Sequence, residues 1–284
     1  MARPLIMVSV YLVYIMGTLA ARAAGAPFDM ARFLSGGLLL TLVVVAIHYA
    51  NEYADYETDA LTWRTPYSGG SGVLPGGRVP RSLALRAAQI SLATGMIAAL
   101  AATILGQLSL LALVLLSIGA AGGWMYSLPP LRLAWHGWGE ADNALLGGMV
   151  LPLYGYVVQG GRLEPRIALA FLPFTLLAFN NLLATTWADR DADRIVGKYT
   201  LATRRTTRQL RRLYALVATG CFALVLFGLG NRLPMAVQST WLTLPLVFWG
   251  WRTYTRIDSP HPSVWAMVVA QLVQIAGWWL AGNG

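Results

Sequence analysis

The sequence has very few of the residues on which a soluble enzyme or a metal-thiolate protein depends. Of its 284 residues only 12% are charged, and cysteine occurs once, as Cys221. A single cysteine excludes a disulfide within the chain and any site built from several thiolates. The three histidines, His48, His136 and His261, are too scattered to indicate a metal-binding motif. Lys198 is the only lysine, so arginine carries nearly all of the positive charge.

Long apolar runs are what the sequence has in abundance. Hydrophobic residues make up 57% of the chain and its mean hydropathy is +0.57, values typical of an integral membrane protein. We predict a single all-α membrane domain over residues 1–284, a bundle of nine transmembrane helices. The N-terminal run is long enough to span a bilayer, so we interpret it as the first span and not as a cleaved signal. The expected spans are 4–24, 30–51, 83–105, 108–126, 141–160, 166–187, 208–229, 234–252 and 262–281.

The distribution of charge predicts an orientation. The net charge of +9 would suggest a nucleic-acid partner in a soluble protein, but here basic residues mark topology and we expect no nucleic acid. With the N-terminus in the cytoplasm, 16 of the 21 cations fall on the cytoplasmic side. We therefore predict a multi-pass protein of the inner (cytoplasmic) membrane with its long loops in the cytoplasm. Ten of the twelve acids lie on the same side, which topology does not explain.

Those acids include two rows of residues with helical spacing, each at the end of an apolar run. The first row is Asn51, Asp55 and Asp59, and the second row is Thr185, Asp189 and Asp193. Residues four apart on a helix lie on one face, about 6 Å apart. Carboxylates gathered at the end of a hydrophobic helix repel one another unless a positive charge lies between them.

A divalent metal ion is the positive charge that this pattern favours. Carboxylate oxygens are hard ligands that suit Mg²⁺, with Mn²⁺ as an alternative, and not zinc or copper. Mg²⁺ takes few carboxylates and completes its shell with water and phosphate oxygens, so two such rows can hold a diphosphate. Solvated loop charges or helix caps are the alternative, but matched rows at two span ends favour the metal site. The candidate catalytic and metal-binding residues are Asp55, Asp59, Asp189 and Asp193, supported by Asn51.

Cations beside the two rows are candidates for binding the diphosphate. Arg64 and Arg78 follow the first row, whereas Arg194 and Lys198 follow the second. A departing diphosphate needs its charge neutralised, which metal ions, arginine and lysine achieve. The arginines of segment 204–212 are better explained as topology signals.

Two loops on the same side are candidates for covering the site. The glycines of loop 60–82 either bring backbone amides to phosphate oxygens or form plain turns, and turns are the better-supported interpretation. Loop 126–140 mixes aromatic, proline and ionisable residues and would exclude water as a lid.

These motifs together resemble the UbiA superfamily of intramembrane prenyltransferases over nearly the whole chain. The resemblance rests on Asn51-x3-Asp55-x3-Asp59, Asp189-x3-Asp193-x3-Gly197-Lys198-x-Thr200-Leu201, Tyr126-x2-Pro129-Pro130-x-Arg132 and His136-Gly137-x-Gly139-Glu140. It implies nine helices around a central cavity, with Mg²⁺ on the Asp motifs binding a polyprenyl diphosphate whose tail lies in an apolar tunnel. It also implies that an allylic cation alkylates an acceptor, usually an aromatic ring. Tyr126, Arg132, His136 and Glu140 would then shape the acceptor end or the lid.

The acceptor is where the resemblance is least definite. The G-K-x-T-L and G-x-G-E segments look most like the branch that prenylates 1,4-dihydroxy-2-naphthoate in menaquinone synthesis. The chain departs from that pattern at Glu52, Gly72, Thr185 and Thr186. Other acceptors therefore stay open, namely 4-hydroxybenzoate, homogentisate, a chlorophyll precursor, a glycerol phosphate lipid or a carotenoid.

Two other classes of function compete with a prenyltransferase. A transporter or channel would need ionisable groups deep within several spans, but the third to fifth and seventh expected spans are almost free of them. A non-catalytic scaffold would leave the matched rows unexplained. We therefore expect a prenyltransferase.

Overall fold

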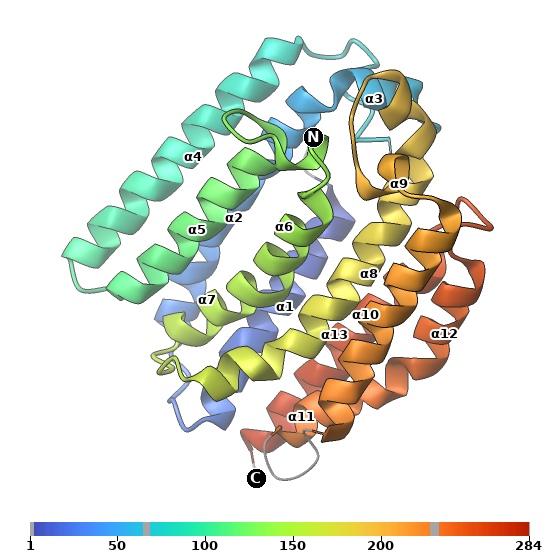
Figure 1. Cartoon of the computed structure of the whole chain (residues 1–284). Coiled ribbons are helices and arrows are strands. Elements are labelled where there is room, and N and C mark those ends of the chain that lie inside the picture. Colours follow the sequence, from blue (N-terminus) through green and yellow to red (C-terminus); the bar gives the residue numbers. More distant parts are fainter. Residues whose placement is uncertain (1–2, 65–68, 228–232, 284) are drawn as a thin grey trace.

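The structure is a computed structural model of the chain, and it describes residues 3–64, 69–227 and 233–283. Within these ranges the regular elements are all helical, as predicted, and Figure 1 shows them side by side in one bundle. Part of the glycine-rich loop (65–68), the end of the seventh expected span and Arg232 lie outside the described residues.

Seven long helices form the frame of the bundle. They are α1 (Pro4–Ala23), α2 (Met30–Ala54), α4 (Arg81–Ile104), α5 (Leu110–Ser127), α8 (Pro165–Ile195), α10 (Thr207–Phe227) and α13 (His261–Ala281). The shorter elements are α3 (Tyr56–Leu61), η1 (Leu133–Trp135), α6 (Gly139–Leu145), η2 (Leu146–Val150), α7 (Leu151–Val158), α9 (Leu201–Arg204), α11 (Met235–Gln238), η3 (Ser239–Thr243) and α12 (Leu244–Thr253).

All seven long helices are long and apolar enough to cross a membrane, and they match seven of the nine expected spans. The other two expected spans are composite within the described residues. The fifth runs through α6, the π-helical turn η2 and α7, and the eighth runs through α11, the 3₁₀ segment η3 and α12. The predicted all-helical membrane bundle is confirmed, whereas of the nine predicted transmembrane helices seven are single helices long enough to cross a membrane and two are interrupted within the described residues.

Local sequence explains where several helices begin. Proline occupies the first turn of α1, α8 and α13, where its missing N–H breaks no hydrogen bond. The Asp29 carboxylate caps α2 by accepting from the Arg32 amide at 3.0 Å. Ser109 caps α5 by accepting from the Ala112 amide at 3.1 Å.

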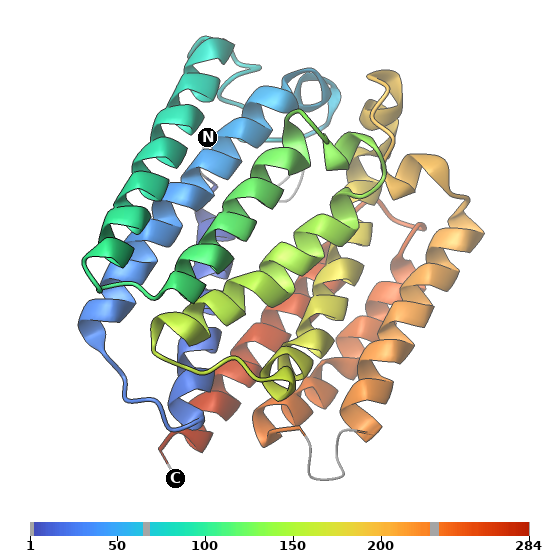
Figure 2. The ribbon, with the colours of Figure 1, turned by 60° about the vertical axis from the view of Figure 1, so that its left-hand side comes forward.

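The first helix lies at the centre of the bundle, packed against α7 and α13. Gly17 of α1 meets the backbone of Pro152 so closely that an added Cβ would overlap it, and Gly155 of α7 meets the backbone of Tyr14 in the same way. Such close backbone approach is how helices associate in lipid, where the hydrophobic effect between helices is absent. Around this centre α2 packs on α4 and α8 packs on α10 (Figures 1 and 2).

The outer surface of the bundle is apolar. On α4, Ile90, Ile97, Leu100 and Ile104 are all more than half exposed. Exposed apolar side chains along a long helix are expected where the neighbour is lipid. The chain is thus a multi-pass membrane protein.

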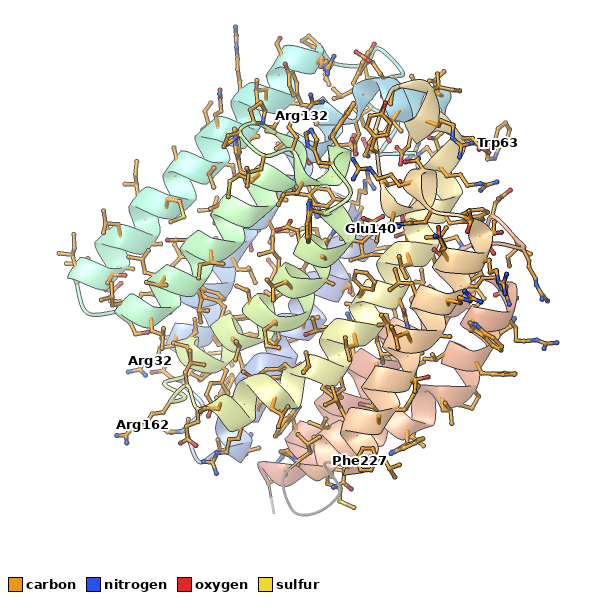
Figure 3. The ribbon with its side chains drawn as sticks, in the orientation of Figure 1. Arg32, Trp63, Arg132, Glu140, Arg162 and Phe227 are labelled. Carbon is orange, nitrogen blue, oxygen red and sulfur yellow. The ribbon has the colours of Figure 1, made fainter. Side chains whose placement is uncertain are left out.

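The two ends of the bundle differ in what they carry. One end holds the N-terminus, α3 and α9, whereas the C-terminus and α11 lie at the other (Figure 1). Arg132 and Glu140 lie toward the first end, and Arg32, Arg162 and Phe227 lie at the opposite end (Figure 3). Because both acid rows follow the helices that rise to the first end, the candidate site lies there.

Candidate active site

The first row lies at the junction of α2 and α3. The helix changes direction at Asp55, but the amide of Asp55 still donates to the Asn51 carbonyl and the amide of Asp59 to the Asp55 carbonyl, each at 2.8 Å. These bonds keep the helical spacing through the junction. The Asn51 side chain donates to Asp55 Oδ2 at 2.8 Å and to Ser127 Oγ at 3.2 Å, so it holds the Asp55 carboxylate in place.

The second row lies on α8, which continues well past the expected span end at 187 to Ile195. Asp189 and Asp193 are therefore on one helical face, one turn apart. The Asp193 side chain is only 1% exposed. Asp189 Oδ1 is buried with no hydrogen-bond partner among the described residues. A buried carboxylate oxygen without a partner indicates a place for a cation or a donor.

Gly197 turns the chain back over the second row. It has a φ of +74°, and its amide donates to the Arg194 carbonyl at 3.3 Å while the Lys198 amide donates to the Asp193 carbonyl at 2.8 Å. This pair of bonds is a Schellman motif, in which glycine adopts the left-handed conformation at low cost. The turn directs the Lys198 side chain back toward the aspartates.

Lys198 joins the two rows. Its ammonium group donates to Asp55 Oδ1 at 3.0 Å and forms an ion pair with Asp193 Oδ1 at 3.5 Å. These three residues come from segments more than 130 positions apart in the sequence. One ammonium in contact with both rows shows that the rows converge at one place.

Two glycines of the loop that precedes α4 pack closely beside the first row. Gly70 has a φ of +63°, and a Cβ added there would overlap the Asp59 carboxylate. Gly72, with a φ of +72°, lies against the Arg64 side chain, where an added Cβ would fall 2.8 Å from Nη1. Both positions therefore require glycine for conformation and for space.

A buried network ties this loop to the N-terminus, and the sequence alone did not reveal it. Glu52, 1% exposed, accepts from Arg3 Nη2 at 3.2 Å and from the Ser71 amide at 2.8 Å, and its second oxygen bonds to the Ser71 hydroxyl. In the sequence, Arg3 is one of the 16 expected cytoplasmic cations and carries no other signal. Its partner is 49 residues away, so no local pattern could have paired them.

Loop 126–140 is held by its own backbone and by the segment that carries Lys198. Arg132 has a φ of +46°, and its guanidinium lies 4.1 Å from the Trp135 ring centre. His136 Nδ1 lies 2.9 Å from the Leu131 carbonyl, and the His136 carbonyl accepts from Arg204 at 3.0 Å. In this structure both predicted lid residues, Arg132 and His136, make contacts near the loop and not with the aspartates.

Glu140 and Tyr126 lie deeper. Glu140 Oε1 accepts from the Leu201 amide at 3.0 Å and from the Thr186 hydroxyl at 3.3 Å, so this carboxylate joins the lid loop, α8 and the start of α9. Tyr126 lies within electrostatic range of Lys198, Asp55 and Glu140. Of the predicted acceptor or lid residues, Tyr126 and Glu140 are both near enough to Lys198 and Asp193 for electrostatic interaction.

The predicted diphosphate-binding arginines are more peripheral than Lys198. Arg64 and Arg78 are exposed and form no ion pair within the described ranges. Arg194 follows Asp193 by one position, which turns it about 100° around α8. It lines an outer cavity together with Trp187. Lys198 is therefore the predicted cation that contacts the rows directly.

Burial and neighbouring charges shift the pKa values of those site residues that lie outside the membrane-spanning helices. Burial and the nearby Asp55 carboxylate raise the pKa of Asp59 to about 8. Burial alone would lower the pKa of Lys198, but Asp55 and Asp193 outweigh it and the net shift is upward. The ammonium of Lys198 is thus held in its charged form by the carboxylates around it.

The carboxylates of the two rows fit a divalent metal ion, although in this structure the Lys198 ammonium lies between them. Across the described residues, no three Asp, Glu, His or Cys side chains converge closely enough to form a ready metal site. The Lys198 ammonium lies between Asp55 and Asp193, and it keeps these two carboxylates apart. Hard carboxylate oxygens and the unpartnered Asp189 Oδ1 are what Mg²⁺ requires.

Two cavities lie near this end of the bundle, one lined by Trp251 and one lined by Trp187, and neither is lined by an aspartate of either row. Between the rows, the Lys198 ammonium lies within 3.5 Å of both Asp55 and Asp193. A substrate whose metal ion binds both carboxylates would have to displace the lysine side chain.

Comparison with known proteins gives matches over nearly the whole chain. A model of the family described as "UbiA prenyltransferase family" matches residues 10–276. A curated relative, 1,4-dihydroxy-2-naphthoate octaprenyltransferase of Bacillus subtilis (strain 168), is 26% identical over 174 residues. That match covers 61% of this chain and 55% of the relative, so it spans about half of the relative's length.

Solved structures share the arrangement of helices. A UbiA homologue from Archaeoglobus fulgidus bound to DMAPP and Mg²⁺ is 18% identical with a TM-score of 0.67, covering 97% of this chain and 96% of that one. The apo structure of a UbiA homologue from Aeropyrum pernix K1 is 17% identical with a TM-score of 0.73, covering 98% of both chains. At these identities the likeness establishes the fold.

Proposed function

Because the chain belongs to the UbiA prenyltransferase family, we propose that it transfers a polyprenyl group from a prenyl diphosphate to an acceptor and releases diphosphate. The observation that carries this proposal is the contact of one lysine with both acid rows, Lys198 with Asp55 and with Asp193. A site that gathers carboxylates around a movable cation at a membrane face suits a substrate with a diphosphate head and an apolar tail.

The roles of the residues follow from their positions. We propose that Asp55, Asp59, Asp189 and Asp193 would hold Mg²⁺, or Mn²⁺ in its place, with Asn51 orienting Asp55. A bound divalent ion would supply charge stabilisation for the leaving diphosphate. The same role is proposed for Lys198 once its ammonium exchanges carboxylate oxygens for phosphate oxygens, with Arg64, Arg78 and Arg194 as outer contributors.

The reaction is a substitution at the allylic carbon of the donor. The bond between that carbon and the diphosphate oxygen breaks, and diphosphate leaves with the electron pair. The carbon then bonds to a ring carbon of the acceptor, which restores its aromatic ring by losing its proton to the released diphosphate or to water or, at a carboxyl-bearing carbon, by losing CO2. The intervening carbocation must be kept from water. Loop 126–140, joined through Glu140 to the Lys198 segment, is positioned to exclude it.

We propose an aromatic quinone precursor as the acceptor, with 1,4-dihydroxy-2-naphthoate of menaquinone synthesis as the first candidate. The name of the Bacillus subtilis relative and the G-K-x-T-L segment support this choice. Tyr126, beside the joined rows, would line the acceptor end together with Arg132 and His136. Of the alternatives, 4-hydroxybenzoate differs least in chemistry, since it too is an activated aromatic ring.

The membrane orientation is part of the proposal. With the N-terminus in the cytoplasm of a cell with an inner membrane, the site would open to the cytoplasmic face. Cys221 is the single cysteine of the chain and is buried. In a Cys221→Ala background, each newly introduced cysteine is therefore the one site that a thiol reagent can label. An impermeant maleimide added to intact cells should then label Gly25→Cys and spare Gly77→Cys, which lie at opposite ends; the reverse pattern would overturn the orientation.

One assay tests the reaction itself. Membranes that contain the protein are incubated with Mg²⁺, a labelled prenyl diphosphate and a panel of aromatic and lipid acceptors, and the product is identified by mass. We expect a prenylated aromatic product that EDTA abolishes. Absence of any prenylated product with all donors and acceptors, from protein that elutes as a folded species, would refute the proposal.

A further inference from the structure

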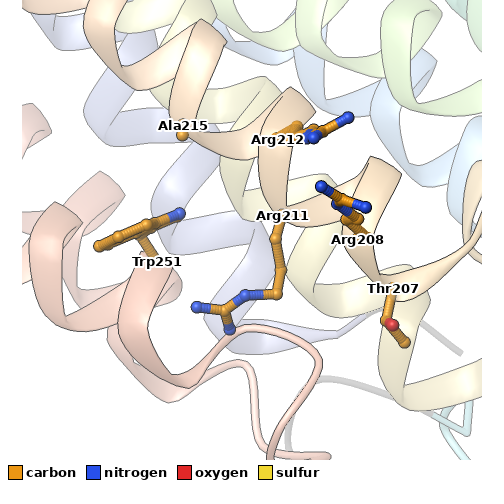
Figure 4. A pocket seen from close by; sticks show the side chains of 6 residues that line it. All are labelled: Thr207, Arg208, Arg211, Arg212, Ala215 and Trp251. Carbon is orange, nitrogen blue, oxygen red and sulfur yellow. The ribbon is translucent and has the colours of Figure 1, made fainter.

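A second polar region at the same end of the bundle lies outside the candidate active site. It is a cavity of about 400 Å³ between the start of α10 and the end of α12, shown in Figure 4. Its lining, which we term the arginine cavity, consists of Thr207, Arg208, Arg211, Arg212, Ala215 and Trp251. None of these residues belongs to either acid row or to the loops that cover them.

The positive charge of the arginine cavity is not neutralised by acids. Arg208 and Arg212 are exposed and have no ion pair or hydrogen bond within the described ranges of the chain. They lie in the first two turns of α10, where the helix dipole is positive and cations are unfavourable. Arg252 and Arg256 add further positive charge around Arg211. Such an arrangement favours the binding of an anion.

One of the three arginines is already held in position. Arg211 Nη1 donates to the Tyr254 carbonyl at 2.7 Å, and the Arg211 guanidinium lies 5.6 Å from the Trp251 ring centre. These contacts fix the guanidinium against the cavity wall before any ligand binds. A preorganised guanidinium with two free neighbours is suited to a phosphate group, which arginine binds in a bidentate manner.

Below the arginines the surface becomes apolar. Leu216, one helical turn beyond Arg212, is 70% exposed, and Phe248, which packs on Trp251 with ring centres 5.7 Å apart, is 56% exposed. Leu216 lies on α10, which is long and apolar enough to cross a membrane, and Phe248 lies on α12, which belongs to the interrupted eighth span. A ligand that fits this surface therefore has an anionic head at the arginines and a hydrocarbon chain along Leu216 and Phe248.

We propose that the arginine cavity binds the phosphate headgroup of an anionic membrane phospholipid. Topology alone requires only positive charge near the membrane face, in any arrangement. It does not require a cavity, a guanidinium fixed by backbone carbonyls or an adjoining apolar strip. Basic pockets between membrane helices are places where anionic lipid headgroups bind.

The test uses the full chain, purified in a neutral detergent and stripped of lipid. Phosphatidylglycerol, phosphatidylcholine and inorganic phosphate are added separately, and bound lipid is counted by native mass spectrometry while the thermal midpoint is followed. We expect phosphatidylglycerol to bind and to raise the midpoint. The zwitterionic lipid and free phosphate should do neither at the same concentration. Equal binding of both lipids, or an equal effect of inorganic phosphate, would overturn the proposal.

Variants of the cavity arginines test whether the lipid binds at the arginine cavity. The double variant Arg208→Gln/Arg212→Gln should bind phosphatidylglycerol roughly 25-fold more weakly, about fivefold for each arginine. Its lipid-free midpoint should equal that of the wild type, because these side chains have no protein partner in the described structure. Arg86→Gln, an exposed arginine at the same end, is the matched control and should bind normally. Unchanged binding by the double variant, or by each single variant if the double fails to fold, would contradict the assignment.

Discussion

Two charged regions lie at the same end of this bundle, and they differ in how their charge is balanced. Around Lys198, buried aspartates from two segments surround one ammonium. Around Arg208 and Arg212, three arginines line one cavity, and its lining within the described residues includes no carboxylate. The first region has more carboxylates than ammonium groups, which supports the proposal that a metal ion replaces the ammonium. The second has an excess of positive charge and can take up an anion.

The largest effect on this comparison is expected when Lys198 is replaced. Lys198→Met leaves Asp55 and Asp193 buried without their shared counter-charge, which costs about 3–5 kcal/mol when one partner of a buried ion pair is lost. We expect a strongly lowered thermal midpoint in EDTA and loss of prenyl transfer. Because the ammonium no longer competes, Mg²⁺ should stabilise this variant more than the wild type.

Thermal unfolding in detergent with and without Mg²⁺ measures both effects. Arg78→Met, which removes an exposed cation near the same end, is the control and should leave the midpoint unchanged. A Lys198→Met protein as stable in EDTA as the wild type would show that the lysine does not hold the rows together.

Two aspartates on α8 sharpen the contrast between buried and solvated charge. Asp189→Asn should lower kcat/KM by roughly a hundredfold or more, because a carboxylate proposed to bind metal becomes a neutral amide. Asp191→Asn changes charge equally only two residues away, but Asp191 is 73% exposed and pairs with Arg190. We expect it to retain activity within about twofold, as surface ion pairs contribute little. Steady-state kinetics with varied Mg²⁺ makes the measurement; equal losses in both variants would contradict the assignment.

The sequence was sufficient for features that are local. Seven spans and both rows, such as Asp189 and Asp193, could be predicted because hydropathy and i, i+4 spacing are properties of neighbouring residues. The Arg3–Glu52 pair could not, since it joins distant segments. The surroundings of Arg194 were also beyond reach, because they depend on segment 202–207 packing beside Trp187 and Arg194.

A pair of glycine substitutions tests whether the contact between the loop before α4 and the first acid row affects substrate binding. Gly70→Ala and Gly77→Ala both place alanine at a positive φ, +63° and +67°, so the backbone strain is matched. Only at Gly70 would the new Cβ overlap the Asp59 carboxylate, since nothing lies within 4 Å of a Cβ at Gly77. We expect Gly70→Ala to raise the KM for the prenyl diphosphate about tenfold, less than the roughly hundredfold cost of a misplacement of about 1 Å, because the end of the Asp59 side chain can shift. Similar kinetics for the two variants would show that the contact with Asp59 is unimportant.

The smallest effect is expected at Arg194, which lies between the two regions. The motif alone makes Arg194 and Lys198 equal candidates for the diphosphate, but α8 turns Arg194 toward the outer cavity beside Trp187. Arg194→Gln should therefore change the KM for the prenyl diphosphate by no more than about threefold, the range of an exposed charge interaction. Raising the salt concentration should shrink this difference further, because exposed charges are screened. A loss that matches that of Lys198→Met and persists in high salt would mean that the substrate-bound enzyme brings this arginine around to the aspartates.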